Sequence, residues 1–311
     1  MTKPDGAGRF TVHVLEPIHE EAIECLRAKV QVVTWEEKDV EHWHDRADAI
    51  IVRSHPVSAA DIAKASKLKV IGKHGAGTDT IDVEAARRKG VEVVSTPGVN
   101  AASVADLALA MALSLSRNLM GHTLALQRGT PLTGPQRVGW EVSELPAGII
   151  GLGAIGRAVA KRLEGGFGVS VTAYDPGIPE DAWPEGIGRA SSLDELLASS
   201  RLLFLHVGLN DATRGMIGSE ELAALPEGAF LINCARGGVV SESALAEALA
   251  SGHLGGAASD VFEQEPPSPD LPLLQQSGFI ATPHIGGSTR EGLRRTGLEV
   301  ASKVMAVLDV E

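Results

Sequence analysis

Three short segments, each following a predicted apolar strand, carry Arg236, Glu265 and His284. The carboxyl ends of parallel strands line the ligand crevice of an open α/β sheet. There, an imidazole can give a proton to a developing alkoxide, a neighbouring carboxylate can fix its tautomer, and a guanidinium can hold a carboxylate and polarise a carbonyl. Each residue alone could be a surface charge or an ion pair, but together they predict reversible reduction of a carbonyl in an anionic substrate.

A glycine-rich motif precedes these segments. Residues 151–156 read Gly-Leu-Gly-Ala-Ile-Gly between an apolar strand and a helix, and Asp175 follows a second strand 19 residues beyond Gly156. This is the context of a dinucleotide-binding turn, in which the free N–H groups of a helix N-terminus face the pyrophosphate. The residues predicted to contact the dinucleotide at this turn are Gly151, Gly153, Ala154, Ile155, Gly156 and Asp175.

Asp175 also indicates which dinucleotide binds. Its carboxylate can accept hydrogen bonds from the ribose hydroxyls, whereas a 2′-phosphate would meet a negative charge. The next residues, Pro176-Gly177-Ile178, supply no cation to offset that repulsion. The sequence therefore predicts NAD rather than NADP.

The composition of the 311-residue chain excludes several classes of protein. Its net charge of −12 argues against a nucleic-acid or anionic membrane surface, and an anionic substrate then needs a local cluster of cations. Two cysteines far apart in sequence favour neither a disulfide framework nor a metal site. The N-terminus has no apolar signal core, so we expect a cytoplasmic protein without metal.

Apolar strand-like runs alternate with helical patterns along most of the chain, which predicts parallel sheets covered by helices on both faces. The length suggests about two domains. Strands are predicted at 10–15, 49–52, 69–71, 91–94, 149–152, 169–174, 202–206, 230–233, 257–261 and 279–281. Helices are predicted at 19–29, 58–66, 82–89, 101–119, 154–164, 192–198, 241–251 and 288–308. Capping boxes are predicted to begin at Ser103 and Ser288.

The run Asn-Cys-Ala-Arg-Gly-Gly at 233–238 and the run Pro-His-Ile-Gly-Gly-Ser-Thr at 283–289 are fairly specific. With Val52-Arg53-Ser54, Gly-Ala-Gly-Thr-Asp at 75–79 and the glycine-rich motif, they make the chain resemble the D-isomer-specific 2-hydroxyacid dehydrogenase family over essentially its whole length. Within it, the phosphoglycerate dehydrogenase branch is the most similar.

The resemblance implies a Rossmann NAD-binding domain of residues 99–283 inserted in a flavodoxin-like substrate domain of residues 1–98 plus 284–311, with the active site in the cleft between them. Dimerisation, or a tetramer, would use the helix from Ser103 and residues 120–146. Further cofactor contacts would come from His206, Val207, Cys234, Ala235, Asp260 and Gly286. Substrate contacts would come from Arg53, Ser54, Lys73, His74, Gly75, Ala76 and Gly77.

Some features depart from the resemblance or leave the substrate open. Residues 144–149 make a shorter entry to the cofactor domain than relatives have, and a chain ending at Glu311 leads us to expect no regulatory domain. D-3-phosphoglycerate is the leading substrate; glyoxylate or hydroxypyruvate reduction and sulfolactate oxidation are alternatives. Glu265, where a formate dehydrogenase would have Gln, disfavours that activity. An NAD(H)-sensing binding protein without turnover is the alternative outside the enzymes.

Overall fold

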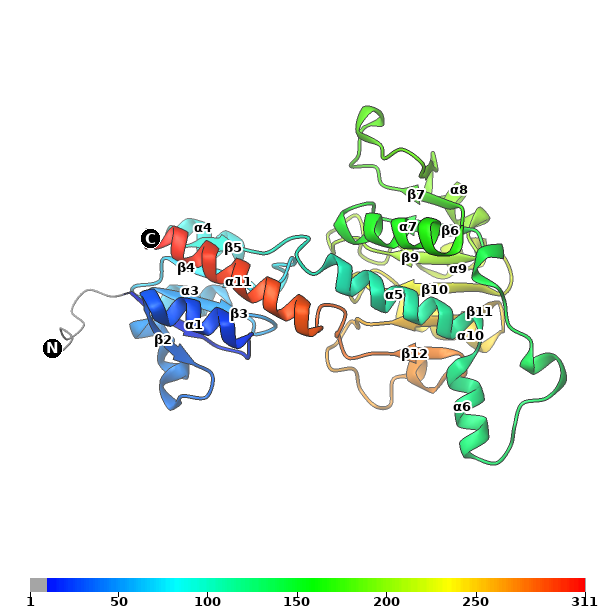
Figure 1. Cartoon of the computed structure of the whole chain (residues 1–311), viewed down its shortest axis with the longest axis horizontal. Coiled ribbons are helices and arrows are strands. Elements are labelled where there is room, and N and C mark those ends of the chain that lie inside the picture. The colour runs from blue at the N-terminus through cyan, green and yellow to red at the C-terminus, as the bar shows by residue number, and fades with distance from the viewer. Residues whose placement is uncertain (1–9, 311) are drawn as a thin grey trace. The chain divides into compact units, whose positions relative to one another are not determined.

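The computed structural model describes residues 10–310, and the chain falls into two compact units. The first comprises the described part of Met1–Asn100 and Gly287–Glu311, and the second is Ala101–Gly286 (Figure 1). Each unit has its own parallel sheet.

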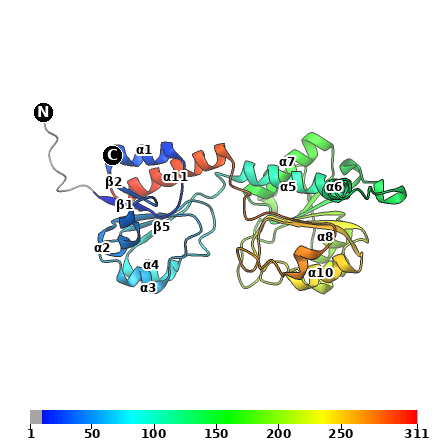
Figure 2. The same ribbon diagram turned by 90° about the horizontal axis from the view of Figure 1, so that it is seen from below.

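The first unit is built on a five-stranded sheet of order β2-β1-β3-β4-β5. Its strands are β1 (Thr11–Val14), β2 (Gln31–Thr34), β3 (Ala49–Val52), β4 (Val70–Lys73) and β5 (Glu92–Val94). Its helices are α1 (Glu20–Lys29), α2 (Trp43–Arg46), α3 (Ala59–Lys64), α4 (Val83–Lys89) and α11 (Arg290–Val307), with a 3-10 turn at Lys38–His42. Figure 2 shows α1 and α11 on one face of this sheet and α2 to α4 on the other.

Strand β3 shows why this unit needs helices on both faces. Its four residues are all fully buried. Successive side chains of a strand point to opposite faces, and accordingly Ala49 and Ile51 join the core under α1 and α11, while Ile50 and Val52 join the core under α3 and α4. A continuous apolar strand of this kind is typical of a parallel sheet buried on both sides.

The second unit is built on a seven-stranded sheet of order β12-β11-β10-β9-β6-β7-β8. Its strands are β6 (Ala147–Ile150), β7 (Val171–Tyr174), β8 (Gly188–Arg189), β9 (Leu202–Leu205), β10 (Ala229–Asn233), β11 (Leu254–Ser259) and β12 (Phe279–Ala281). Its helices are α5 (Ala101–Ser116), α6 (Leu119–Gln127), α7 (Ala154–Phe167), α8 (Leu193–Ser199), α9 (Ser219–Ala224) and α10 (Glu242–Ala250). Its 3-10 turns lie at Gly134–Arg137, Val142–Glu144, Glu180–Ala182 and Pro272–Gln275.

The predicted fold class is confirmed in both units. All strand pairs are parallel, and α5 and α7 cover one face of the larger sheet while α8, α9 and α10 cover the other. The strand orders are the flavodoxin-like order in the first unit and the dinucleotide-binding order, extended by one strand, in the second. In both orders, ligands bind at the carboxyl ends of the strands.

Two predicted helix caps and one predicted helix end were wrong. Helix α5 begins at Ala101, so Ser103 is a buried residue of its first turn and not a cap. Helix α11 is capped by Thr289, one residue after Ser288, through a hydrogen bond from the N–H of Gly292 at 2.9 Å. The helix predicted at 101–119 ends at Ser116, and Asn118, with φ at +46°, breaks it from α6.

Candidate active site

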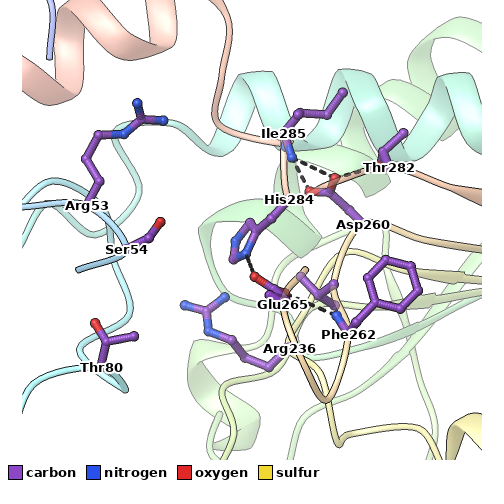
Figure 3. Close-up of polar contacts among 12 residues, drawn as sticks. Arg53, Ser54, Thr80, Arg236, Asp260, Phe262, Glu265, Thr282, His284 and Ile285 are labelled. Carbon is purple, nitrogen blue, oxygen red and sulfur yellow. Dashed lines mark hydrogen bonds and ion pairs between the residues drawn. The ribbon is translucent and has the colours of Figure 1, made fainter. Parts of the chain in front are cut away.

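The carboxyl ends of β10, β11 and β12 carry Arg236, Glu265 and His284, all within the second unit. Nδ1 of His284 lies 2.8 Å from Oε2 of Glu265, and both side chains are partly exposed (Figure 3). With Nδ1 engaged by the carboxylate, Nε2 is the ring nitrogen that can exchange a proton with a ligand. The structure therefore joins two of the three predicted catalytic residues directly.

The charge of Glu265 is stabilised by its neighbours. Partial burial raises the pKa of this carboxyl group, but the hydrogen bond and charge of His284, the N–H of Phe262 and the charge of Arg236 together hold the pKa below its ordinary value. Glu265 is therefore an anion at neutral pH, and its charge faces Nδ1 of His284.

Arg236 lies beside this pair on a loop that Asn233 shapes. Buried Asn233 accepts the N–H of Ala235 at 3.0 Å and donates to the carbonyl of Arg236 at 3.4 Å. The guanidinium donates to the carbonyl of Ala235 at 2.7 Å, and its charge reaches Glu265. Asn233 belongs to the motif at 233–238, but the sequence alone did not indicate this role.

Asp260 organises the turn that presents His284. His284 has φ at +53°, a left-handed conformation that a non-glycine residue rarely adopts without support. The buried Asp260 carboxylate accepts the Thr282 hydroxyl at 2.6 Å and the N–H groups of Ile285 and Gly286 at 2.8 Å each, and its carbonyl accepts the N–H of His284 at 2.8 Å. Figure 3 shows the carboxylate inside this turn. The predicted contact of Asp260 with the cofactor carboxamide stays a prediction.

The glycine-rich turn has the geometry that a dinucleotide needs. Gly151 has φ at +89°, and a Cβ there would lie 2.6 Å from the carbonyl oxygen of His206. A Cβ on Gly156 would collide with the carbonyl oxygen of Gly151, whereas a Cβ on Gly153 would meet no other atom of residues 10–310 within 4 Å. Helix α7 has no side-chain cap at Gly153, so its first N–H groups remain available to an anion. Ala154 and Ile155 are the first two residues of this helix. The glycine-rich turn and the N-terminus of α7 therefore fit a pyrophosphate.

Asp175 follows β7 beside this turn. Its carboxylate accepts the N–H of Leu152 at 2.8 Å and that of Gly177 at 3.0 Å. An ionised carboxylate has about four acceptor positions, so two bonds leave capacity for ribose hydroxyls. Asp175 thus fixes the glycine-rich turn, and its predicted contact with the ribose stays a prediction.

The other predicted cofactor residues follow β9 and β10. The His206 ring stacks on Phe204, burial lowers its pKa to about 3, and neither ring nitrogen finds a hydrogen-bond partner within residues 10–310. Burial, helped by the charge of Asp260, raises the pKa of Cys234 to about 12. Both side chains are therefore neutral at physiological pH. Val207 and Ala235 adjoin them, Val207 partly exposed and Ala235 buried.

The first unit places its predicted substrate residues at the carboxyl ends of β3 and β4. Arg53 is partly exposed, and its guanidinium donates to the carbonyl of Pro17 at 3.1 Å. Lys73 is buried, and its ammonium donates to the carbonyl of Arg53 and to the Thr80 hydroxyl. Lys73 was predicted to contact the substrate directly. Its ammonium binds two groups within the first unit.

The turn after β4 combines a buried imidazole with small residues. Burial and the nearby Arg53 charge lower the pKa of His74 to about 4, so this imidazole is neutral at physiological pH. Gly75 has φ at +145° and donates its N–H to the Thr96 hydroxyl at 3.0 Å, and the exposed Ala76 and partly exposed Gly77 follow it.

Two kinds of feature are missing from the part of the chain that the structure describes. Residues 10–310 contain no group of three or more His, Cys, Asp or Glu side chains placed to hold a metal ion. Over the same residues, no helix combines the length and the apolar character that crossing a bilayer requires.

Comparisons with known proteins match most of the chain. The family model described as "D-isomer specific 2-hydroxyacid dehydrogenase, NAD binding domain" matches residues 109–286. The chain is 42% identical to a D-3-phosphoglycerate dehydrogenase of Methanocaldococcus jannaschii over 95% of its own length and 57% of that protein. It is 39% identical to a hydroxypyruvate reductase of Thermotoga maritima, over 97% of this chain and 99% of the relative.

A solved structure extends the comparison to the fold. The D-lactate dehydrogenase of Aquifex aeolicus, complexed with NAD and lactic acid, superposes with a TM-score of 0.85 at 29% identity, covering 96% of this chain and 95% of that one. The chain thus spans little more than half of its phosphoglycerate dehydrogenase relative but nearly all of the other two proteins. By the family model and by these identities, the chain belongs to the D-isomer specific 2-hydroxyacid dehydrogenase family.

Proposed function

We propose that the protein is an NAD-dependent dehydrogenase that interconverts a small anionic 2-hydroxy acid and its 2-oxo acid, with D-3-phosphoglycerate as the leading substrate. The observation that carries the proposal is the 2.8 Å pair of His284 and Glu265 with Arg236 beside it. When bound, NAD supplies the hydride acceptor for oxidation and, as NADH, the hydride donor for reduction.

In the direction of reduction, Arg236 holds the substrate carboxylate and polarises the C2 carbonyl. Nε2 of protonated His284 gives a proton to the oxygen as it gains negative charge, and Glu265 stabilises the imidazolium before transfer. In oxidation the neutral imidazole takes the hydroxyl proton. Arg53 and Ser54, supported by the turn at 74–77, recognise the anionic end of the substrate.

A panel of four 2-oxo acids tests the function and ranks the substrates. NADH oxidation is measured with phosphohydroxypyruvate, hydroxypyruvate, glyoxylate and sulfopyruvate. We expect robust turnover, with the highest kcat/KM for phosphohydroxypyruvate because Arg53 adds a cation for a second negative charge. A higher value for hydroxypyruvate would instead favour the activity named for the T. maritima relative, which this chain matches over 97% of its length. Negligible turnover with all four would contradict the proposed function.

Asp175→Asn is predicted to relax the preference for NADH over NADPH. The variant keeps the size of the side chain and removes the charge that would repel a 2′-phosphate. The dissociation constant of NADPH divided by that of NADH should therefore fall by about tenfold. Fluorescence titration with both cofactors measures it. Asp194→Asn, an exposed charge change on α8 in the same unit, is the control. An unchanged ratio would remove Asp175 from the ribose site.

We propose that two copies of the chain associate through α6 and the segment after it. The resemblance places the subunit contact at residues 120–146 and at the helix that contains Ser103. Figure 1 shows both extending from the body of the second unit. They carry exposed apolar side chains at Leu119, Met120, Leu124, Leu126, Val138 and Trp140. Leu126 is 69% exposed and Val138 is 79% exposed. A contiguous exposed apolar surface of this kind is typical of a protein–protein interface.

Leu126→Asp is predicted to shift the protein from dimer, or tetramer, toward monomer, because the interface would bury an unpaired charge. Light scattering after size-exclusion chromatography measures the mass. Phe167→Asp, an exposed apolar residue at the end of α7, is the matched control. A monomeric wild-type protein, or a variant of unchanged mass, would contradict this interface.

We also propose a cytoplasmic location. Cys25 and Cys234 are both free thiols, which suits a reducing compartment. Fractionation of cells tests this, and recovery of the protein in a secreted or membrane fraction would contradict it.

A further inference from the structure

An internal carboxylate holds the backbone of the loop that carries Arg53. Glu16, which follows β1, accepts the N–H of Arg53 at 2.5 Å, that of Ser54 at 2.8 Å and that of His55 at 2.8 Å. Three consecutive N–H groups converging on one carboxylate form the concave arrangement that elsewhere binds a free anion. Here the protein supplies the anion, so these N–H groups fix the loop and do not bind substrate.

The same loop is fixed at two further points. The carbonyl next to Glu16, that of Pro17, accepts the Arg53 guanidinium at 3.1 Å. On its other side the Arg53 carbonyl accepts the buried Lys73 ammonium, which also donates to Thr80. Arg53 is therefore held at its N–H, its carbonyl and its guanidinium, although its side chain is partly exposed.

We propose that Glu16 is a positioning residue for substrate recognition: by binding three N–H groups it sets the backbone from which the Arg53 and Ser54 side chains reach the substrate anion, with Lys73 part of the same frame. This inference rests on the proposed function. A loop that is already ordered loses less conformational entropy when the substrate binds, so the binding free energy is more favourable. The effect should therefore appear in the KM of the 2-oxo acid and not in kcat.

Electrostatics alone predicts the opposite sign. A carboxylate close to an anion-binding side chain repels the substrate, so removing its charge would tighten binding. Positioning predicts that the same change weakens binding. The three N–H groups converge on Oε2, and a neutral amide oxygen accepts them less strongly than a carboxylate oxygen does. The amide would also turn an NH₂ group toward the N–H of Ser54, which Oε1 accepts at 3.0 Å. The direction of the change in KM therefore decides between the two roles.

The test compares Glu16→Gln with the wild type, using the preferred 2-oxo acid of the panel. We expect a rise in the KM for that acid of about tenfold, an unchanged kcat and an unchanged dissociation constant for NADH. Glu24→Gln, an exposed change of the same kind on α1, is the control and should change none of these. Glu16→Asp, which keeps the carboxylate one methylene shorter, should restore most of the wild-type KM.

A double-mutant cycle with Arg53→Ala separates positioning from general damage. If Glu16 acts through Arg53, then Glu16→Gln should have little further effect on KM in the Arg53→Ala background. Equal effects in both backgrounds, or an unchanged or lower KM in Glu16→Gln alone, would overturn the proposal. Thermal unfolding and NADH binding verify folding, and if Glu16→Gln does not fold, Glu16→Asp carries the same cycle with a smaller expected rise. A wild-type protein without turnover would instead contradict the proposed function.

Discussion

His284→Ala is expected to lower kcat for reduction of the preferred 2-oxo acid by about 10²–10⁴-fold, the usual contribution of a positioned general acid. Among Arg236, Glu265 and His284, the imidazole is the group that can deliver a proton to the C2 oxygen. Its 2.8 Å contact with Glu265 engages Nδ1 and leaves Nε2 for this transfer. Steady-state kinetics with saturating NADH measures the loss.

Two controls accompany this variant. NADH should bind it with the wild-type dissociation constant, because the glycine-rich turn and Asp175 do not contact the imidazole in the structure. His253→Ala, which removes a hydrogen bond to the carbonyl of Leu222 elsewhere in the same unit, should keep its turnover. Wild-type turnover in His284→Ala would discard its acid–base role.

Glu265→Gln is expected to lower kcat/KM for reduction at neutral pH by about tenfold and to move the pH profile of reduction to the acidic side. The pKa of Glu265 is lowered in the folded protein, so the carboxylate is charged throughout the neutral range. Reduction needs the imidazolium, which the neutral amide no longer stabilises. As pH rises, the rate of reduction by the variant should therefore begin to fall at a lower pH than in the wild type. Oxidation needs the neutral imidazole, so the variant should keep its rate of oxidation at lower pH than the wild type.

Profiles of kcat/KM against pH in both directions measure this shift. Glu263→Gln, an exposed neighbour two residues away, is the matched control and should leave both profiles unchanged. A Glu265→Gln profile that coincides with the wild type would show that the carboxylate does not act on the imidazole.

The main elements of the fold could be predicted because apolar strands alternate with amphipathic helices, as in β3, whose residues enter both cores. Boundaries were less predictable. Ser288 and Thr289 are adjacent residues of equal capping chemistry, and only the backbone conformation selects Thr289. The break at Asn118 depends on one left-handed residue that has no periodic signal.

The candidate site was predictable where side-chain chemistry itself carries the signal, as for the His284 and Glu265 pair. It was not predictable where a side chain serves the backbone. Asn233, Asp260 and Glu16 act by binding N–H groups whose positions are set by tertiary structure. The one available signal for Glu16 is its place after β1, at the same sheet edge as Arg53.

Transfer of deuterium is the most direct test of the central claim that hydride moves between the nicotinamide and C2 of the substrate. The enzyme is supplied with NADH deuterated at both C4 positions and with its preferred 2-oxo acid, and the product is analysed by mass spectrometry and chiral chromatography. We predict a D-2-hydroxy acid with one deuterium at C2 and an oxygen-bound proton from solvent. Oxidation of the NADH without deuterium at C2 of a 2-hydroxy acid would contradict the account.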